Sequence, residues 1–135
     1  MKQAGDQQKT DKTVTIQELK DMVQKFGDER NWEKHFSAKN LAMNIAIEAA
    51  ELMEHFVWEW DNEPDQAEVA AELSDIIFNC LNFAVRNNID ISQTFLRKYQ
   101  KLVVKYPVEL FNKDATNQEE YKRIKQAYRQ GKAPK

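Results

Sequence analysis

The chain has 135 residues, a length typical of one domain, and its three glycines and three prolines leave few positions for tight turns. A net charge of −2 and a pI near 5.8 argue against a general nucleic-acid binder. No apolar stretch reaches the ~18 residues that span a membrane, and the start lacks a signal-peptide core. The single Cys80 fits a reducing compartment. We therefore expect a cytoplasmic protein with no membrane or nucleic-acid partner.

The first part of the chain predicts a polar tail followed by one amphipathic helix. Residues 1–14 are rich in Lys, Gln and Asp and are expected to be disordered. Thr15 and Glu18 have the spacing of a capping box, so a helix should begin directly after Thr15. Gly27-Asp28 marks the expected end of this helix, although residues 29–32 could also continue it.

The segment 32–37 carries unusually large side chains for a connection. Trp32, His35 and Phe36 stand close together in it, and it contains no glycine. Solvated linkers seldom carry such residues, so we expect the segment to pack against other parts of the protein. Two interpretations remain open: a hydrophobic staple into the next helix, or one wall of a ligand pocket.

Two long helices are predicted in the middle of the chain. Ser37 suits the N-cap of a helix that runs to about Trp60. After a reversal at residues 59–64, a second helix should begin at Pro64 or Asp65. The expected apolar seams consist of Leu41, Ile45, Leu52 and Phe56 in the first helix, and of Val69, Leu73, Ile76, Ile77, Cys80, Leu81 and Ala84 in the second.

The C-terminal part predicts two further helices. Asn87-Asn88 should end the preceding helix, because Asn tolerates the left-handed conformation. Ser92 can cap a helix that runs to about Lys105, where Tyr106-Pro107 stops it. A capping box at residues 116–119 then opens a polar helix that runs to about residue 129.

These elements predict an all-α class with a core of about four helices, because no strand shows convincing alternation. The predicted division of the chain is a disordered tail at residues 1–14, a helical domain at 15–111, and a polar basic helix and tail at 112–135. The basic residues of that last segment are expected to be solvated.

Two pairs of carboxylates lie in the two central helices. Glu48 with Glu51, and Glu72 with Asp75, are each spaced by three residues, so the members of a pair share one helix face. The two pairs also lie at nearly equal distances from Asn62, so an antiparallel hairpin would bring all four together. Burying four carboxylates without cations is costly, which favours a metal site. The alternative is two solvated acidic faces.

The ligand types predict a hard cation. Carboxylates without an obligatory His or Cys suit Mg²⁺ or Mn²⁺. A di-iron bundle would require Glu-x-x-His on two helices, and Glu48 and Glu72 are followed at that spacing by Glu51 and Asp75. Mg²⁺ usually meets substrate phosphates, and a basic helix face could complete such a site or merely be solvated; it consists of Lys98, Lys101 and Lys105.

In their order along the chain, several motifs resemble those of the MazG-like all-α nucleoside triphosphate pyrophosphohydrolases, most closely the dCTP pyrophosphatase branch. The family pattern is Trp, a His/Phe segment, Lys/Arg-Asn-Leu, E-x-x-E, an aromatic residue, E-x-x-D and Tyr-Pro. It is met here by Trp32, His35-Phe36, Lys39-Asn40-Leu41, Glu48 to Glu51, Trp58, Glu72 to Asp75 and Tyr106-Pro107. The match covers roughly residues 16–110.

The resemblance implies a four-helix-bundle-like fold that works as a dimer or a dimer of dimers, with the site near a subunit boundary. It implies Mg²⁺-dependent cleavage of a deoxynucleoside triphosphate, with dCTP first, into a monophosphate and pyrophosphate, a house-cleaning role in the nucleotide pool. Glu48, Glu51, Glu72 and Asp75 would be the catalytic residues and metal ligands. The residues implied to contact the substrate are Trp32, His35, Phe36, Lys39, Asn40, Trp58, Asn79, Lys98, Lys105 and Tyr106.

Three positions depart from the family pattern, and all three concern the expected nucleoside pocket. Relatives often have His at Phe36, Tyr at Asn79 and Asn at Leu102. The carboxylates follow the pattern, so the reaction is more firmly implied than the base. The alternative from a different class is a non-catalytic helical interaction protein, similar to an antitoxin.

Overall fold

The computed structural model describes residues 9–57, 63–111 and 118–132. They form two compact units, Met1–Asp90 and Ile91–Lys135, and each unit is described by itself. Within the described residues the protein is all-α, with five α-helices and two short 3₁₀ helices, which confirms the predicted class. No helix in this part of the chain is long and apolar enough to cross a membrane.

The first helix, α1 (Ile16–Glu29), begins as the sequence predicts. The hydroxyl oxygen of Thr15 accepts a hydrogen bond from the backbone N–H of Glu18 at 3.1 Å, and the backbone N–H of Thr15 donates to the Glu18 carboxylate at 2.7 Å. This reciprocal capping box satisfies two N–H groups at the start of the helix. The hydrogen bond from Thr15 also lowers the pKa of Glu18.

Gly27 and Asp28 lie inside α1, so of the two expectations for the end of this helix, the structure shows the continuation past them. The helix continues to Glu29, with Arg30 as its C-cap. A methyl group at Gly27 would lie 3.0 Å from the Phe36 ring and 3.2 Å from the Arg86 guanidinium. The glycine is therefore explained by the close approach of two side chains, which local helix propensity does not reveal.

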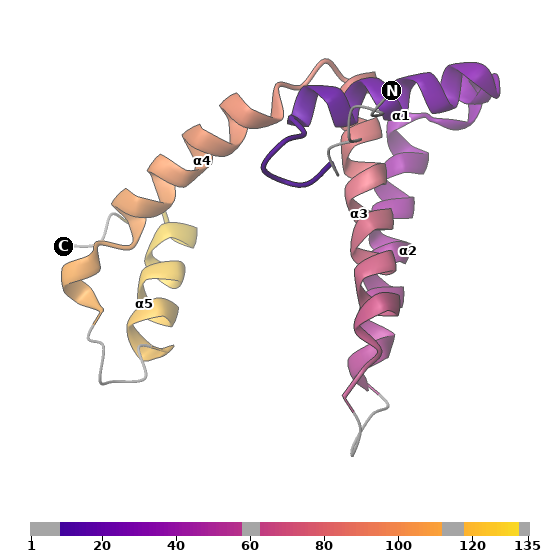
Figure 1. Cartoon of the computed structure of the whole chain (residues 1–135). Coiled ribbons are helices and arrows are strands. Elements are labelled where there is room, and N and C mark those ends of the chain that lie inside the picture. Colours follow the sequence, from indigo (N-terminus) through magenta and orange to yellow (C-terminus); the bar gives the residue numbers. More distant parts are fainter. Residues whose placement is uncertain (1–8, 58–62, 112–117, 133–135) are drawn as a thin grey trace, which may run out of the picture. The chain divides into compact units, whose positions relative to one another are not determined.

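Helices α2 (Ala38–Val57) and α3 (Gln66–Arg86) form an antiparallel hairpin and lie side by side (Figure 1). Ser37 accepts a hydrogen bond from the N–H of Asn40 at 3.2 Å, which confirms it as the cap of α2. Asp65 is the N-cap of α3, so the expected start at Pro64 or Asp65 is slightly too early. The predicted end of α2 at Trp60 and most of the predicted reversal lie outside the described residues.

The buried core of this unit is small. Leu41 of α2 and Leu81 of α3 are buried, together with Val23 of α1. Other predicted seam positions are exposed, among them Leu73 at 48% and Ile77 at 46%. The predicted apolar seams are therefore only partly buried in the chain taken alone, because two long helices and one shorter helix cover only part of each apolar face.

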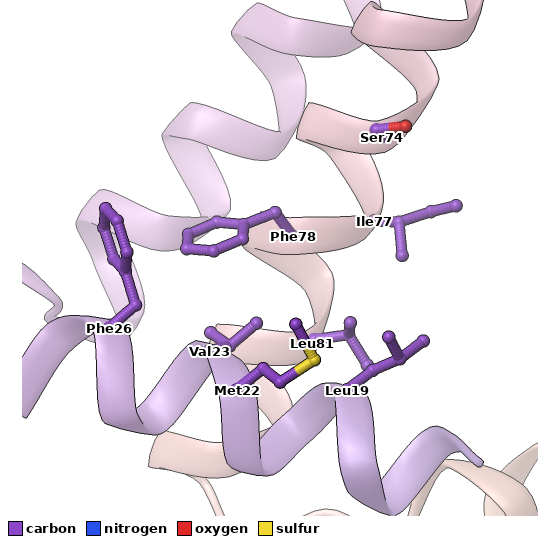
Figure 2. Close-up of a pocket in the computed structure, with 8 residues that line it drawn as sticks. All are labelled: Leu19, Met22, Val23, Phe26, Ser74, Ile77, Phe78 and Leu81. Atoms are coloured by element: carbon purple, nitrogen blue, oxygen red, sulfur yellow. The ribbon is translucent and has the colours of Figure 1, made fainter. Parts of the chain in front are cut away.

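Helix α1 crosses the end of the hairpin where α2 begins and α3 ends (Figure 1). The ring of Phe26 meets that of Phe78 edge to face at 5.5 Å between centroids, and the Lys20 ammonium donates to the Ile89 carbonyl at 3.0 Å. Between α1 and α3 lies an apolar groove of about 380 Å³ (Figure 2). Its lining residues are Leu19, Met22, Val23, Phe26, Ser74, Ile77, Phe78 and Leu81.

The second unit contains α4 (Ile91–Lys105), the 3₁₀ helix η2 (Val108–Leu110) and α5 (Gln118–Arg129). Helix α4 begins at Ile91, so Ser92 lies in its first turn and the prediction that it is the cap is wrong. The end of α4 before Tyr106-Pro107 is confirmed.

Helix α5 packs through one fully buried side chain, Ile124. Beside it, the rings of Tyr106 and Tyr121 stack at 5.4 Å between centroids. The first half of the predicted capping box at 116–119 lies outside the described residues, as does most of the tail predicted to be disordered. The predicted domain boundaries at residues 14 and 111 stay predictions.

Candidate metal centre

Three of the four predicted carboxylates converge between α2 and α3. Glu48 and Glu51 extend from α2 and Glu72 from α3, and each offers an oxygen within 4.8 Å of the others. Residues spaced by three on a helix point about 60° apart, so a pair can face one point on a neighbouring helix. Asp75, the fourth, is exposed and lies outside this group. The arrangement is a cluster of hard oxygen donors contributed by two helices.

The cluster concentrates the negative charges of neighbouring carboxylates. The pKa of Glu48 is raised above its usual value of 4.5, first by burial and then by the charges of Glu51, Asp75 and Glu72. Asp75 is thus close enough to Glu48 for its charge to raise the pKa of that carboxyl group. Binding of a cation lowers the free energy of carboxylates that are held this close together. The donor set therefore fits a divalent metal ion.

The raised pKa of Glu48 predicts a stability effect in metal-free protein. A carboxyl group whose pKa is higher in the folded state destabilises the fold increasingly as pH rises from 4.5 through the folded pKa. Glu48→Gln removes this penalty, so the variant should melt at a higher temperature than the wild type at pH 7 in EDTA, and the difference should be smaller at pH 4.5. Mg²⁺ should then stabilise the wild type more than the variant, which has lost one carboxylate donor.

The measurement is differential scanning fluorimetry, with Glu54→Gln as the matched control because Glu54 is exposed on the same helix and outside the cluster. A lower melting temperature for Glu48→Gln than for the wild type at pH 7 in EDTA would contradict the electrostatic account.

The rings of Trp32 and Phe36, which follow α1, pack with that of Phe26 and form an aromatic wall. The 3₁₀ helix η1 (Trp32–His35) begins after Asn31, whose φ of 53° is the left-handed conformation that Asn tolerates. The Trp32 ring meets that of Phe26 at 5.6 Å and that of Phe36 at 6.1 Å, both edge to face. Trp32 remains 42% exposed. The segment thus packs on α1, as expected, and also presents an accessible indole ring.

Arg86, at the end of α3, contacts this wall and two acidic residues beside it. Its guanidinium lies 3.7 Å from the Asp28 carboxylate, 3.6 Å from that of Glu33, and 5.7 Å from the centre of the Phe36 ring. These contacts join the end of α1, η1 and α3. Arg86 was not among the site residues predicted from the sequence.

Two of the predicted polar substrate residues make contacts within the protein. The side-chain amide of Asn40 donates to the His35 carbonyl at 3.2 Å, and that of Asn79 donates to the Asp75 carbonyl at 3.0 Å. Asn79 is buried, whereas Lys39 is exposed in the first turn of α2. Their contacts with a substrate stay predictions.

The remaining predicted substrate residues are not brought to this centre by the described contacts. Trp58 lies outside the described residues. Lys98 and Lys105 belong to the second unit, where the Lys105 ammonium lies 5.2 Å from the Tyr106 ring and 4.6 Å from the Tyr128 ring. Their proposed role toward phosphates stays a prediction.

Sequence reasoning did not assign a role to His55, which contacts Glu72 across the hairpin. His55 lies four residues after Glu51, on the same line of the helix as the carboxylates. That spacing indicated that His55 lies near the carboxylates. Only the structure shows that it faces Glu72 on α3.

Comparisons with known proteins agree with the motif order. The profile of the MazG-like family matches residues 43–124. The dCTP pyrophosphatase 1 of Bos taurus is 32% identical over 104 residues, and that of Mus musculus is 30% identical over the same length. These alignments cover 71% of this chain and 62% and 61% of the two relatives, so the chain spans about three fifths of their length.

A crystal structure supports the same relationship. A pyrophosphatase from Archaeoglobus fulgidus DSM 4304 is 34% identical and superimposes with a TM-score of 0.63. The superposition covers 68% of this chain and 92% of the archaeal chain. Since the family profile spans more than half of the sequence, the chain belongs to the MazG-like family.

Proposed function

We propose that this protein is a Mg²⁺-dependent pyrophosphohydrolase that cleaves a deoxynucleoside triphosphate, with dCTP first, between the α and β phosphates. The observation that carries the proposal is the convergence of Glu48, Glu51 and Glu72 from two helices. The names of the relatives, dCTP pyrophosphatase 1 and an archaeal pyrophosphatase, support the reaction class.

The carboxylate cluster would hold the ion. Glu48, Glu51 and Glu72 supply oxygen donors, and Asp75, one turn from Glu72, is the proposed fourth ligand. Their donor chemistry suits Mg²⁺, with Mn²⁺ as a substitute. When bound, the ion supplies charge neutralisation at the phosphates and lowers the pKa of a coordinated water.

The residues of the chain orient the reactants. The carboxylates would fix the position of the ion that the triphosphate binds, so that water can attack the α-phosphorus, and a carboxylate of the same cluster would accept the proton of that water. The P–O bond to the β phosphate then breaks, which releases pyrophosphate and a nucleoside monophosphate.

The aromatic wall is the proposed binding surface for the nucleoside. Trp32 is accessible and can stack on a base, and Phe36 contributes an apolar edge. The other proposed contacts with the base, sugar or phosphates are those named from the family motifs: His35, Lys39, Asn40, Trp58, Asn79, Lys98, Lys105 and Tyr106.

Product analysis tests the reaction. Purified protein is incubated with each of the common nucleoside triphosphates, with Mg²⁺ or with EDTA, and pyrophosphate, orthophosphate and nucleotides are separated. The expected products are pyrophosphate and a monophosphate, abolished by EDTA. Orthophosphate with a diphosphate would mean attack at another phosphorus. No turnover on any substrate would favour the non-catalytic helical interaction protein.

A preference for deoxynucleotides is expected because a 2′-hydroxyl group would be desolvated against the apolar ring of Phe36. An apolar pocket rejects an added hydroxyl group by roughly 10- to 100-fold. We therefore expect kcat/KM for dCTP to exceed that for CTP by this factor. The comparison includes dATP, dTTP and dGTP to rank the bases, and an equal or greater rate on CTP refutes the preference.

We also propose that the active form is a homodimer or a dimer of dimers. Large apolar side chains remain exposed on both helices of the hairpin, including Ile47, Phe56, Leu73 and Ile77. Exposed apolar surface of this kind on two packed helices is typical of protein interfaces. A second copy of the chain would cover it, and its boundary would then lie close to the carboxylate centre.

A further inference from the structure

His55 lies between two carboxylates of the facing helix. Its Nε2 atom is 3.7 Å from an oxygen of Glu72, and its Nδ1 atom is 3.9 Å from an oxygen of Glu68. The side chains of His55 and Glu72 are only 21% and 24% exposed, whereas that of Glu68 is 68% exposed. The imidazole ring is therefore enclosed in the hairpin at the end that faces the metal centre and more open toward Glu68.

His55 contacts a member of the carboxylate cluster without belonging to it. Among the described residues, the oxygens that lie within 4.8 Å of one another come from Glu48, Glu51 and Glu72, and no nitrogen of His55 is part of that group. The ring thus lies beside Glu72 at a separation slightly longer than a hydrogen bond, so an N–H group at Nε2 attracts the carboxylate as a nearby dipole without a formed hydrogen bond. A residue that contacts a metal ligand from outside the ligand cluster can orient that ligand.

The contact between His55 and Glu72 joins α2 to α3 at the carboxylate cluster. Glu72 is the only member of the converged group that extends from α3, so the position of its carboxylate determines whether the two helices form one site. A long Glu side chain has several rotamers, and fixing one of them before the metal arrives removes an entropic cost of binding.

We propose that His55 is a positioning residue, which holds the Glu72 carboxylate toward Glu48 and Glu51 and is itself oriented by Glu68. The inference rests on the proposed function, because it assumes that the cluster binds a divalent ion. It assigns His55 an effect on metal affinity through Glu72, and no direct contact with the metal or the substrate.

The experiment measures Mn²⁺ affinity in the absence of nucleotide, by electron paramagnetic resonance titration of wild type, His55→Leu and His55→Gln. Loss of an outer partner of a metal ligand typically weakens binding 10- to 100-fold, and this is the result expected for His55→Leu. His55→Gln keeps an N–H donor and should recover most of the affinity. In the pyrophosphate assay, His55→Leu should need correspondingly more metal but approach the wild-type kcat when metal is saturating.

A purely structural role gives a different pattern. In that case His55→Leu changes the melting temperature of the metal-free protein while its Mn²⁺ dissociation constant equals that of the wild type, and the proposal is overturned. Equal loss of affinity in His55→Gln and His55→Leu also overturns it, since the donor would then be irrelevant.

The wild-type protein separates this inference from the proposed function. Wild type that binds Mn²⁺ but hydrolyses no nucleotide refutes the proposed function, while the dissociation constants of the variants still decide the role of His55. Wild type that does not bind Mn²⁺ refutes both.

Discussion

Replacing Glu51 with Gln is expected to reduce pyrophosphate release by roughly 10³-fold, with the fold retained. The carboxylate is one of three that converge between α2 and α3, and the amide removes its charge and one hard oxygen donor. Metal-assisted charge stabilisation is worth several kcal/mol, and each ~1.4 kcal/mol corresponds to a factor of ten in rate. Glu51 is exposed, so the substitution leaves the buried core intact.

The measurement is kcat/KM for dCTP at saturating Mg²⁺, together with the circular dichroism spectrum and melting temperature of each variant. Glu54→Gln is the matched control, because it makes the same chemical change three residues further along the same exposed helix surface. A folded Glu51→Gln variant with wild-type turnover would show that the converged carboxylates are not the reaction centre.

The convergence of the carboxylates was predictable from the sequence because it depends on two simple periodicities. Each pair is spaced by three residues, and the pairs are nearly equidistant from the reversal, so an antiparallel hairpin brings Glu48, Glu51 and Glu72 together. Asp75 points about 60° away from Glu72 around the helix axis. Whether it joins the group therefore depends on the crossing of the two helices, which spacing alone does not determine.

Features that depend on tertiary contacts were not predictable in the same way. Gly27 resembles a helix end, but its role is to let Phe36 and Arg86 approach α1. Ser92 has the chemistry of a cap, yet α4 begins one residue before it. The contact of His55 with Glu72 requires the register between two helices, and a shift of one residue would remove it. Local propensity identifies candidates in each case, and packing decides among them.

Many large apolar side chains on the surface of the hairpin stay exposed in the isolated chain, which favours a partner that covers them. Ile77 is 46% exposed and lines the groove between α1 and α3, as Figure 2 shows, and Leu73 is 48% exposed one turn earlier. Fully burying an Ile or Leu side chain contributes about 1.5–3 kcal/mol. In a two-fold symmetric interface each position occurs twice, so one substitution acts on both copies.

Wild-type protein is therefore expected to have a mass in solution of two or four times the 15.9 kDa of the chain, and Ile77→Asp is expected to shift it toward one. Losing about 2 kcal/mol at each of two symmetric positions raises the dimer dissociation constant by roughly 10³-fold, and a buried unpaired charge adds to this. Size-exclusion chromatography with light scattering measures the mass across a dilution series.

Gln66→Asp is the control for the added charge, because Gln66 is an exposed polar residue at the start of the same helix. If the catalytic site lies near a subunit boundary, turnover by Ile77→Asp should fall with dilution in parallel with the loss of dimer, while Gln66→Asp stays active. Parallel loss would connect the apolar face to the carboxylate centre. A wild-type chain that is monomeric and fully active would contradict the proposed assembly and would leave the exposed face of α3 to a different partner.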